Sequence, residues 1–178
     1  MTTELARLDV VSVAVLAFVT AQRLAELIYA RRNEARLKAL GGQEHGAGHY
    51  AWIVTLHTAW LIGLWLLAAS TRPDSTWLLA FIVLQCLRLW VLVTLGRRWT
   101  TRIIVLPGAP LISSGPYRLL AHPNYAVVAA EIFVLPMAYG LLVFALLFSG
   151  LNASVLAVRI RAEERALRDA VIASRRSS

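Results

Sequence analysis

The sequence predicts an all-α integral membrane protein with about five transmembrane helices. The last two form a short helical hairpin, and a cytoplasmic C-terminal helix follows. Hydrophobic residues make up 58% of the 178-residue chain, above the roughly 45–50% of soluble domains, and the mean hydropathy is +0.64. Charged residues are only 16% and stand in short runs between long apolar stretches. This composition is typical of a polytopic membrane protein, and the length favours a single domain over residues 1–178.

The first three spans are predicted over residues 8–30, 51–70 and 75–95. Each has about the 20 residues that a hydrocarbon core of roughly 30 Å requires. The first apolar stretch runs on without a clear small-residue cleavage site, so we expect it to remain as a membrane helix and not to be removed as a signal peptide.

Residues 125–158 are too long for one straight crossing, because a single helix would reach about 50 Å. Pro136 and Gly140 interrupt this stretch near its middle. The break predicts two short helices, over residues 125–138 and 141–158, in a tight hairpin; one tilted, kinked helix is the alternative. Strong helix formers over residues 159–173, with Arg159 and Glu163 at i,i+4, predict a helix that continues out of the membrane.

The distribution of positive residues predicts the topology. With five spans, one side of the membrane holds fourteen of them: Arg31, Arg32, Arg36, Lys38, Arg97, Arg98, Arg102, Arg118, Arg159, Arg161, Arg165, Arg168, Arg175 and Arg176. The other side holds only Arg7 and Arg72. The positive-inside rule makes the richer side cytoplasmic. The membrane that we expect is a bacterial inner membrane, with the active site and the C-terminus on its cytoplasmic side. A four-span chain would put the tail opposite the loop around Arg118.

Other classes of site are disfavoured. The net charge of +8 lies at the ends of spans and not on a basic face with exposed aromatics, so nucleic-acid binding is not expected. Cys86 stands alone, which excludes an intramolecular disulfide and a Cys-rich zinc site. His45 and His49 have the spacing of a metal pair on a helix, but the glycines around them favour a flexible loop over residues 41–50. No metal is expected.

Four charged residues, Arg23, Glu26, Arg88 and Glu131, lie inside predicted spans. Such groups are expensive in a bilayer and usually face the protein interior or a water-filled cavity. For Glu131, a functional role and simple pairing with Arg88 or Arg23 remain open. Arg23, near the cytoplasmic end, is also placed where it can snorkel.

A polar island runs from Gly115 to Tyr125. Pro123 suits the first turn of a helix, which places His122 just before a helix N-terminus, where backbone N–H groups favour an anionic ligand group. Tyr117 and Tyr125 offer contacts to a nucleoside; alternatively, they anchor the chain at the lipid interface.

A second polar cluster, Arg159 to Glu164, follows the last span. Adjacent carboxylates on a helix point in different directions, so Glu163 or Glu164 can face a pocket while the other faces water. A carboxylate that faces the pocket suits an ammonium or a ribose, and a solvated helix face is the alternative.

The two clusters together resemble the isoprenylcysteine carboxyl methyltransferase family, which is related to phospholipid methyltransferases. The resemblance is carried by Gly115-Pro116-Tyr117, His122-Pro123-Asn124-Tyr125, Glu131, Arg159-Ile160, Glu163-Glu164 and Leu167. It is specific over residues 99–167, which would form the cofactor region. It implies an integral-membrane, S-adenosylmethionine-dependent enzyme that methylates a lipophilic acceptor.

The N-terminal half is similar to a bacterial branch of this family that is associated with type III polyketide synthases. That branch methylates long-chain alkylpyrones and alkylresorcinols. The residues that carry the similarity are Arg23-Leu24-Ala25-Glu26-Leu27, Arg31-Arg32-Asn33-Glu34, Gly41-Gly42 and His49-Tyr50. The expected acceptor is therefore a prenylcysteine-like carboxylate or a long-chain alkylpyrone or phenol.

The resemblance also implies roles for individual residues. The residues expected to bind S-adenosylmethionine are Leu111, Ile112, Tyr117, His122, Pro123, Asn124, Tyr125 and Glu163. Arg159 would face the reacting end of the substrate and orient a carboxylate, which needs no base, whereas a phenol would benefit from His122 or Glu131 as base. The chain departs from the family pattern at Ala121, where Arg or Lys is usual, and at Val127, where Gly is frequent.

Two other functions stay open from the sequence. Phospholipid N-methylation would use the same cofactor on an amine. A small transporter or assembly subunit would use Arg23, Arg88 and Glu131 to line a path through the bilayer, without catalysis.

Overall fold

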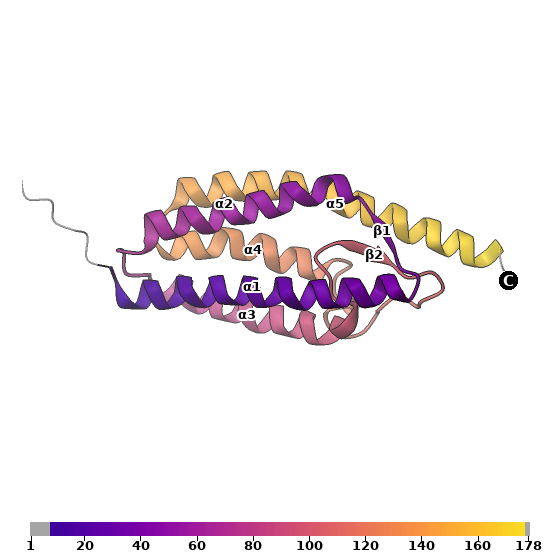
Figure 1. Ribbon diagram of the computed structural model, residues 1–178. Helices are drawn as coiled ribbons and strands as arrows, with labels where there is room; N and C mark the ends of the chain where they lie inside the picture. Colours follow the sequence, from indigo (N-terminus) through magenta and orange to yellow (C-terminus); the bar gives the residue numbers. More distant parts are fainter. Residues whose placement is uncertain (1–7, 177–178) are drawn as a thin grey trace, which may run out of the picture.

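The computed structural model describes residues 8–176, which form a bundle of helices that run alternately up and down (Figure 1). The helices are α1 Val10–Ala39, α2 Tyr50–Ala68, α3 Ser75–Leu95, α4 Pro123–Ala138 and α5 Leu142–Arg176. The side chains of His49 and of residues 171–178 lie outside the described part, as does Arg7.

The first helix is longer than the predicted span, which ended at residue 30. The apolar stretch ends there, but the helix formers that follow carry α1 on to Ala39, just before Gly41 with φ +89°. At the other end Asp9 caps α1, because its carboxylate accepts a hydrogen bond of 2.9 Å from the Ser12 N–H. Arg31, Arg32 and Arg36, which the prediction placed in a loop after the first span, therefore lie on α1.

The break at Pro136 and Gly140 produces a tight turn between α4 and α5. Gly140 adopts φ +70°, and the backbone N–H of Leu141 donates to the Pro136 carbonyl at 3.1 Å. The 16 residues of α4 extend about 24 Å and the 35 residues of α5 about 52 Å. Within residues 8–176, four helices (α1, α2, α3 and α5) are long and apolar enough to cross a membrane, and α4 is a shorter apolar helix.

A small sheet departs from the all-α prediction. Strand β1, Gln43–His45, pairs antiparallel with β2, Ile103–Val105, with Glu44 opposite Ile104. A short 3₁₀ helix, η1 (Ala47–His49), then leads into α2. The expectation of a plain flexible loop over residues 41–50 is thus corrected: strands of three residues are too short to show an alternating pattern in the sequence.

The core lies between α1, α2 and α4, where Leu16, Trp60, Leu64, Ile132 and Leu135 are fully or almost fully buried. Helices α2 and α5 approach closely at Gly63, where a Cβ would lie 2.5 Å from the Phe144 ring. This close packing fixes the position of α5 relative to the rest of the bundle.

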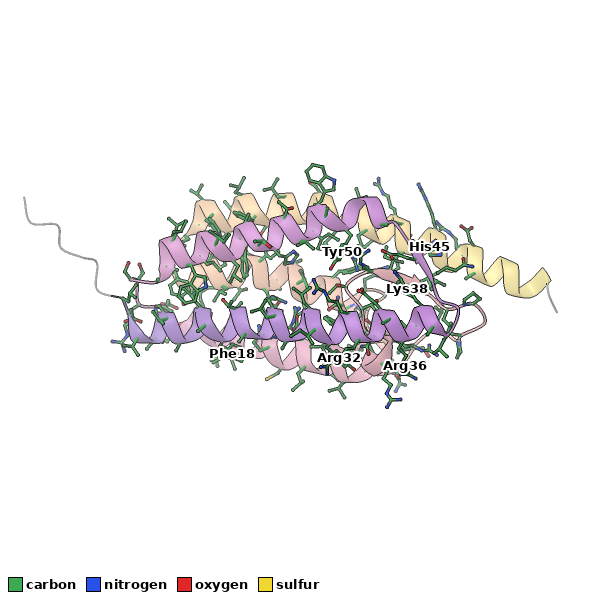
Figure 2. All side chains as sticks on the ribbon, in the orientation of Figure 1. Phe18, Arg32, Arg36, Lys38, His45 and Tyr50 are labelled. Carbon is green, nitrogen blue, oxygen red and sulfur yellow. The ribbon has the colours of Figure 1, made fainter. Side chains whose placement is uncertain are left out.

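Both long loops and the C-terminal end of α5 lie at one end of the bundle, on the right in Figure 1. Lys38, His45 and Tyr50 lie near this end in Figure 2, and Arg32 and Arg36 project outward from α1. The connections between α2 and α3 and between α4 and α5 lie at the opposite end. The two polar clusters of the sequence are therefore brought to the same end of the molecule.

Candidate active site

The polar island is held against α3 by Gly115. This residue adopts φ +58°, and an added Cβ would lie 2.6 Å from the Thr94 Oγ1. Both the positive φ and the close approach favour glycine. A 3₁₀ helix, η3 (Gly115–Arg118), follows, and then Pro123 begins α4 with His122 as its N-cap residue. The island therefore ends at a helix N-terminus, as its sequence predicts.

A hydrogen-bonded chain joins the island to α5. The Tyr125 hydroxyl donates to Glu163 Oε2 at 2.5 Å, and Arg159 Nε donates to the Tyr125 oxygen at 2.8 Å. His122 stacks on the Tyr125 ring with 5.4 Å between centroids, and its Nδ1 lies 3.8 Å from Glu163 Oε2. The structure thus brings together four residues that the sequence assigned to one site.

Arg159 has a further contact that sets its direction. Its Nη2 donates to the Thr101 carbonyl at 2.6 Å, and the side chain is almost completely buried. The Thr101 hydroxyl in turn donates to Glu34 Oε1 at 3.1 Å and lies 3.1 Å from the Tyr50 hydroxyl. Residues from α1, α2 and the 99–102 segment therefore position the guanidinium.

A cavity of about 440 Å³ lies beside this network, within the usual range for small-molecule pockets of roughly 300–1,000 Å³. Seven of the eight residues expected to bind the cofactor line it: Leu111, Ile112, Tyr117, His122, Asn124, Tyr125 and Glu163. Pro123 does not line it, but it begins the helix that presents Asn124 and Tyr125. We refer to this space as the polar cavity.

Tyr117 stays protonated at neutral pH, because burial, with a smaller contribution from the Glu163 carboxylate, raises its pKa to about 12. Its hydroxyl is then available as a donor. The wall of the polar cavity also contains Ala121, where the family usually has a cation, so this position offers only a methyl group. Val127, the second departure, is buried in α4 and does not line the cavity.

Strand β2 of the two-stranded sheet forms part of the wall of the polar cavity. Ile103 and Val105 of β2 line the cavity and pack against Ala166 of α5. Glu44 of β1 accepts hydrogen bonds from Lys38 of α1 and Arg102 next to β2. These ion pairs tie the sheet to the end of α1.

A second cavity, of about 320 Å³, lies between α1, α2, α4 and α5. Its walls are mainly apolar, with Leu24, Val54, Leu61 and Ile62 among the lining residues, and we call it the apolar cavity. Leu24 and Ile62 are more than half exposed on the outer surface of α1 and α2. This opening faces sideways, where lipid would surround the bundle.

The polar and apolar cavities share one wall. Five residues line both: Trp99, Thr100, Asn124, Tyr125 and Arg159. We call this shared wall the junction. A water-soluble ligand in the polar cavity and a lipophilic ligand in the apolar cavity would therefore meet at Arg159 and Tyr125.

Glu131 lies apart from the junction, in a buried group of four charges. It accepts from Arg23 Nη2 and Arg88 Nη1, each at 2.7 Å, and its side chain is fully buried. Glu26 pairs with the same two arginines. Both pairings left open by the sequence are present, and Glu131 lines neither cavity, whereas Arg23, Glu26 and Arg88 line the apolar one.

Several residues of the site were not assigned to it from the sequence. Trp99, Thr101 and Asn152 line the apolar cavity, and the only signal in the sequence was the amide of Asn152 within an apolar span. Trp99 is buried, and its indole N–H donates to no partner among the residues that the structure describes. For Trp99 and Thr101 the sequence offered no motif.

Comparisons with known proteins agree with this architecture. The model of the "Isoprenylcysteine carboxyl methyltransferase (ICMT) family" matches residues 77–169. The chain is 43% identical over 159 residues to "Uncharacterized protein YpbQ" of Bacillus subtilis (strain 168), which covers 86% of this chain and 95% of that protein. No solved structure matches the chain. The protein belongs to the isoprenylcysteine carboxyl methyltransferase family and is an integral membrane methyltransferase.

Proposed function

We propose that this protein transfers a methyl group from S-adenosylmethionine to an oxygen of a lipophilic acceptor. The observation that carries the proposal is the junction, where a polar cavity and an apolar cavity share Arg159 and Tyr125. Two separate cavities that meet at a buried cation suit one water-soluble and one lipophilic reactant. The acceptor is a prenylcysteine-like carboxylate or a long-chain alkylpyrone or phenol.

The residues of the polar cavity suit the cofactor by their chemistry. The Glu163 carboxylate matches an ammonium or ribose, Leu111 and Ile112 match an adenine ring, and Tyr117 offers a donor. These residues would hold the cofactor, which would supply a methyl group on a sulfonium, a leaving group that can accept the electron pair of the C–S bond when the methyl group goes to the acceptor oxygen. Pro123 contributes by starting α4, which orients Asn124 and Tyr125.

Arg159 orients the acceptor. Two of its nitrogens are engaged by Tyr125 and Thr101, which fixes the guanidinium plane and leaves Nη1 for an acceptor oxygen. A direct displacement needs little beyond alignment of the reactants, and a buried, preoriented cation supplies that alignment for a carboxylate or phenolate. A cation at the junction repels the ammonium form in which the amine acceptor of phospholipid N-methylation would arrive, so the junction suits an oxygen acceptor better.

A phenol would also have to lose its proton. His122 is the base we propose for that case, because it stacks on Tyr125, which lines the junction where the acceptor would end. Its ring nitrogens lie 3.6 Å from Glu164 Oε1 and 3.8 Å from Glu163 Oε2. Glu131, the other candidate, accepts hydrogen bonds from Arg23, Arg88 and Gln85. We therefore propose a positioning role for Glu131.

The branch associated with type III polyketide synthases is supported by the position of its motif residues. Glu34 and Tyr50 contact Thr101, and Arg23 and Glu26 line the apolar cavity. Five residues of these motifs line the apolar cavity, where we propose that the acceptor binds: Arg23, Leu24, Glu26, Leu27 and Tyr50. We propose that they adapt the cavity to a long alkyl chain that enters sideways between α1 and α2, with the junction at the cytoplasmic face of a bacterial inner membrane.

The test is cofactor binding by Glu163→Gln, measured by calorimetry on the purified protein in detergent. The amide keeps the shape and an oxygen for Tyr125 but removes the charge. We expect wild type to bind S-adenosylmethionine and the variant to lose detectable binding.

Glu164→Gln is the matched control, because Glu164 is the next residue, its side chain is 49% exposed, and it does not line the polar cavity. It should bind the cofactor as wild type does. Unchanged affinity in Glu163→Gln would contradict the assignment of Glu163, and no binding by wild type would contradict the proposed function.

A further inference from the structure

The apolar cavity has polar residues at two depths. The outer level lies at the junction. Next to it, Asn33 Nδ2 donates to the carbonyl of the junction residue Trp99 at 2.8 Å and to the Gly96 carbonyl at 3.2 Å. Tyr50 and Arg159 reach the same level through Thr101. Residues from α1, α2, α5 and the end of α3 are therefore connected here by hydrogen bonds.

A second polar level lies about 10 Å deeper, since seven residues of helix rise by about that distance. Counting seven residues inward leads from Asn33 to Glu26 on α1, from Tyr50 to His57 on α2, from Leu95 to Arg88 on α3 and from Arg159 to Asn152 on α5. The ion pair between Glu26 and Arg88 confirms that two of these positions are neighbours. All four deeper residues line the apolar cavity.

A cavity built only for a hydrocarbon tail would not need polar side chains at this depth, because each polar group that is buried without a partner is unfavourable. Glu26 and Arg88 satisfy one another. Asn152 differs: it is only 2% exposed, and its Nδ2 donates to no partner among the described residues. The amide is thus an unused hydrogen-bonding group at the wall of the cavity.

His57 complements this amide. Its Nδ1 lies 2.8 Å from the Ile53 carbonyl, which can only accept, so Nδ1 carries the proton of the neutral ring. Nε2 is then an acceptor. The deeper level therefore offers a donor on α5 and an acceptor on α2, and a hydroxyl group is the simplest group that can use both.

We propose that the deeper level is a second recognition site for the acceptor. It binds a hydroxyl group about 10 Å along the chain from the oxygen that receives the methyl group. The inference rests on the proposed function, because it takes the apolar cavity as the acceptor site. It narrows the substrate class from a plain long-chain acid or phenol to one that is hydroxylated in mid-chain.

The test compares two probes, stearate and stearate with a mid-chain hydroxyl group. Binding to the purified protein in detergent is followed by tryptophan fluorescence, without cofactor. Wild type should favour the hydroxylated probe by roughly 3- to 10-fold, the range expected for a net gain of one hydrogen bond. Asn152→Leu, which keeps the size of the side chain, should lower this preference to about one-fold. Because partitioning into detergent affects both proteins equally, it cancels when the preferences are compared.

Ser149→Ala is the matched control. Ser149 stands one turn away on α5, its buried Oγ also has no partner in the described part of the chain, and it does not line the apolar cavity. Its preference should equal that of wild type. His57→Phe is a second variant, on another helix, and it should also lose the preference for the hydroxylated probe. It tests the inference if Asn152→Leu does not fold.

The outcomes separate the two proposals. Equal preference in wild type and in a folded Asn152→Leu or His57→Phe, or failure of both probes to bind, would overturn the second recognition site. Calorimetry with S-adenosylmethionine on the same wild-type sample is independent of the probes. A protein that binds the cofactor but does not distinguish the probes would keep the proposed function and lose this inference.

Discussion

Arg159 shows how one side chain can serve two cavities. Its Nε and Nη2 are held by Tyr125 and Thr101, and the guanidinium stands 5.5 Å above the Tyr125 ring. The residue lies on α5, but the partners that aim it come from α4 and from the segment before β2. Its direction therefore depends on contacts between residues far apart in the sequence.

Replacement of this residue should separate catalysis from cofactor binding. In Arg159→Ala the acceptor loses a charge-assisted hydrogen bond of roughly 1.5–3 kcal/mol, which corresponds to a roughly 10- to 150-fold loss of turnover. Cofactor affinity should change much less, because Glu163 and Tyr117 remain. The measurements are steady-state methyl transfer and calorimetry on the same preparation. A larger loss of cofactor affinity than of turnover would move Arg159 into the cofactor site.

The sequence predicted best which site residues lie close together where those residues belong to one short motif. His122 and Tyr125 are three residues apart at the start of one helix, so their proximity followed from helix geometry. Glu163 and Arg159 follow the same rule on α5. Trp99 and Thr101 could not be found in this way, because they reach the site through an irregular segment whose path is set by Asn33 and Glu34.

The two-stranded sheet is the element that the sequence did not predict. Its strands have three residues each, and 57 residues separate the end of β1 from the start of β2. The pairing is stabilised from outside the strands, by the contacts of Ile103 and Val105 with α5 and by the ion pairs of Glu44. Long-range packing of this kind leaves no periodic pattern.

Removal of the Glu44 charge should loosen the sheet over the polar cavity. Hydrogen bonds from Lys38 and then Arg102 lower the pKa of Glu44 below its ordinary value. The carboxylate therefore stabilises the fold above about pH 4.5, and this contribution is lost as the pH falls through the lowered pKa. The pairs are partly exposed to solvent, so Glu44→Gln should raise the hydrogen-exchange rate of the β2 amides at pH 7 by only about two- to five-fold.

The control for this prediction is the pH itself. As the pH falls through the lowered pKa of Glu44, wild type loses the charge that the variant lacks, so at acid pH the difference between the two proteins should be smaller than at pH 7. High salt at pH 7 should also reduce it, since exposed ion pairs are screened. A difference that is the same at both pH values would mean that the amide disturbs the sheet by its shape and not by its charge.

For the whole molecule, the alternation of the helices decides which segments can share a site. An odd number of helices places the loop after α1, the loop after α3 and the end of α5 together, and Figure 1 shows them at one end. The sequence predicted this from the charge count and from the break at Pro136 and Gly140. The predicted helix over residues 125–138 is close to α4, Pro123–Ala138, because Pro123 begins the helix and the break at Pro136 and Gly140 ends it. What the charge count could not supply was the continuation of α1 from residue 30 to Ala39.

The five-helix arrangement makes a direct prediction of topology. All fourteen positive residues of the richer side lie in three segments: α1 after residue 30, the loop after α3, and α5. By the positive-inside rule we predict that this end faces the cytoplasm. A reporter fused after Ser178 should therefore read cytoplasmic, and one inserted at Arg72, in the turn between α2 and α3, should read from the opposite side. Two reporters on the same side would mean that α4 and α5 do not both cross, and that the junction is not formed at a single membrane face.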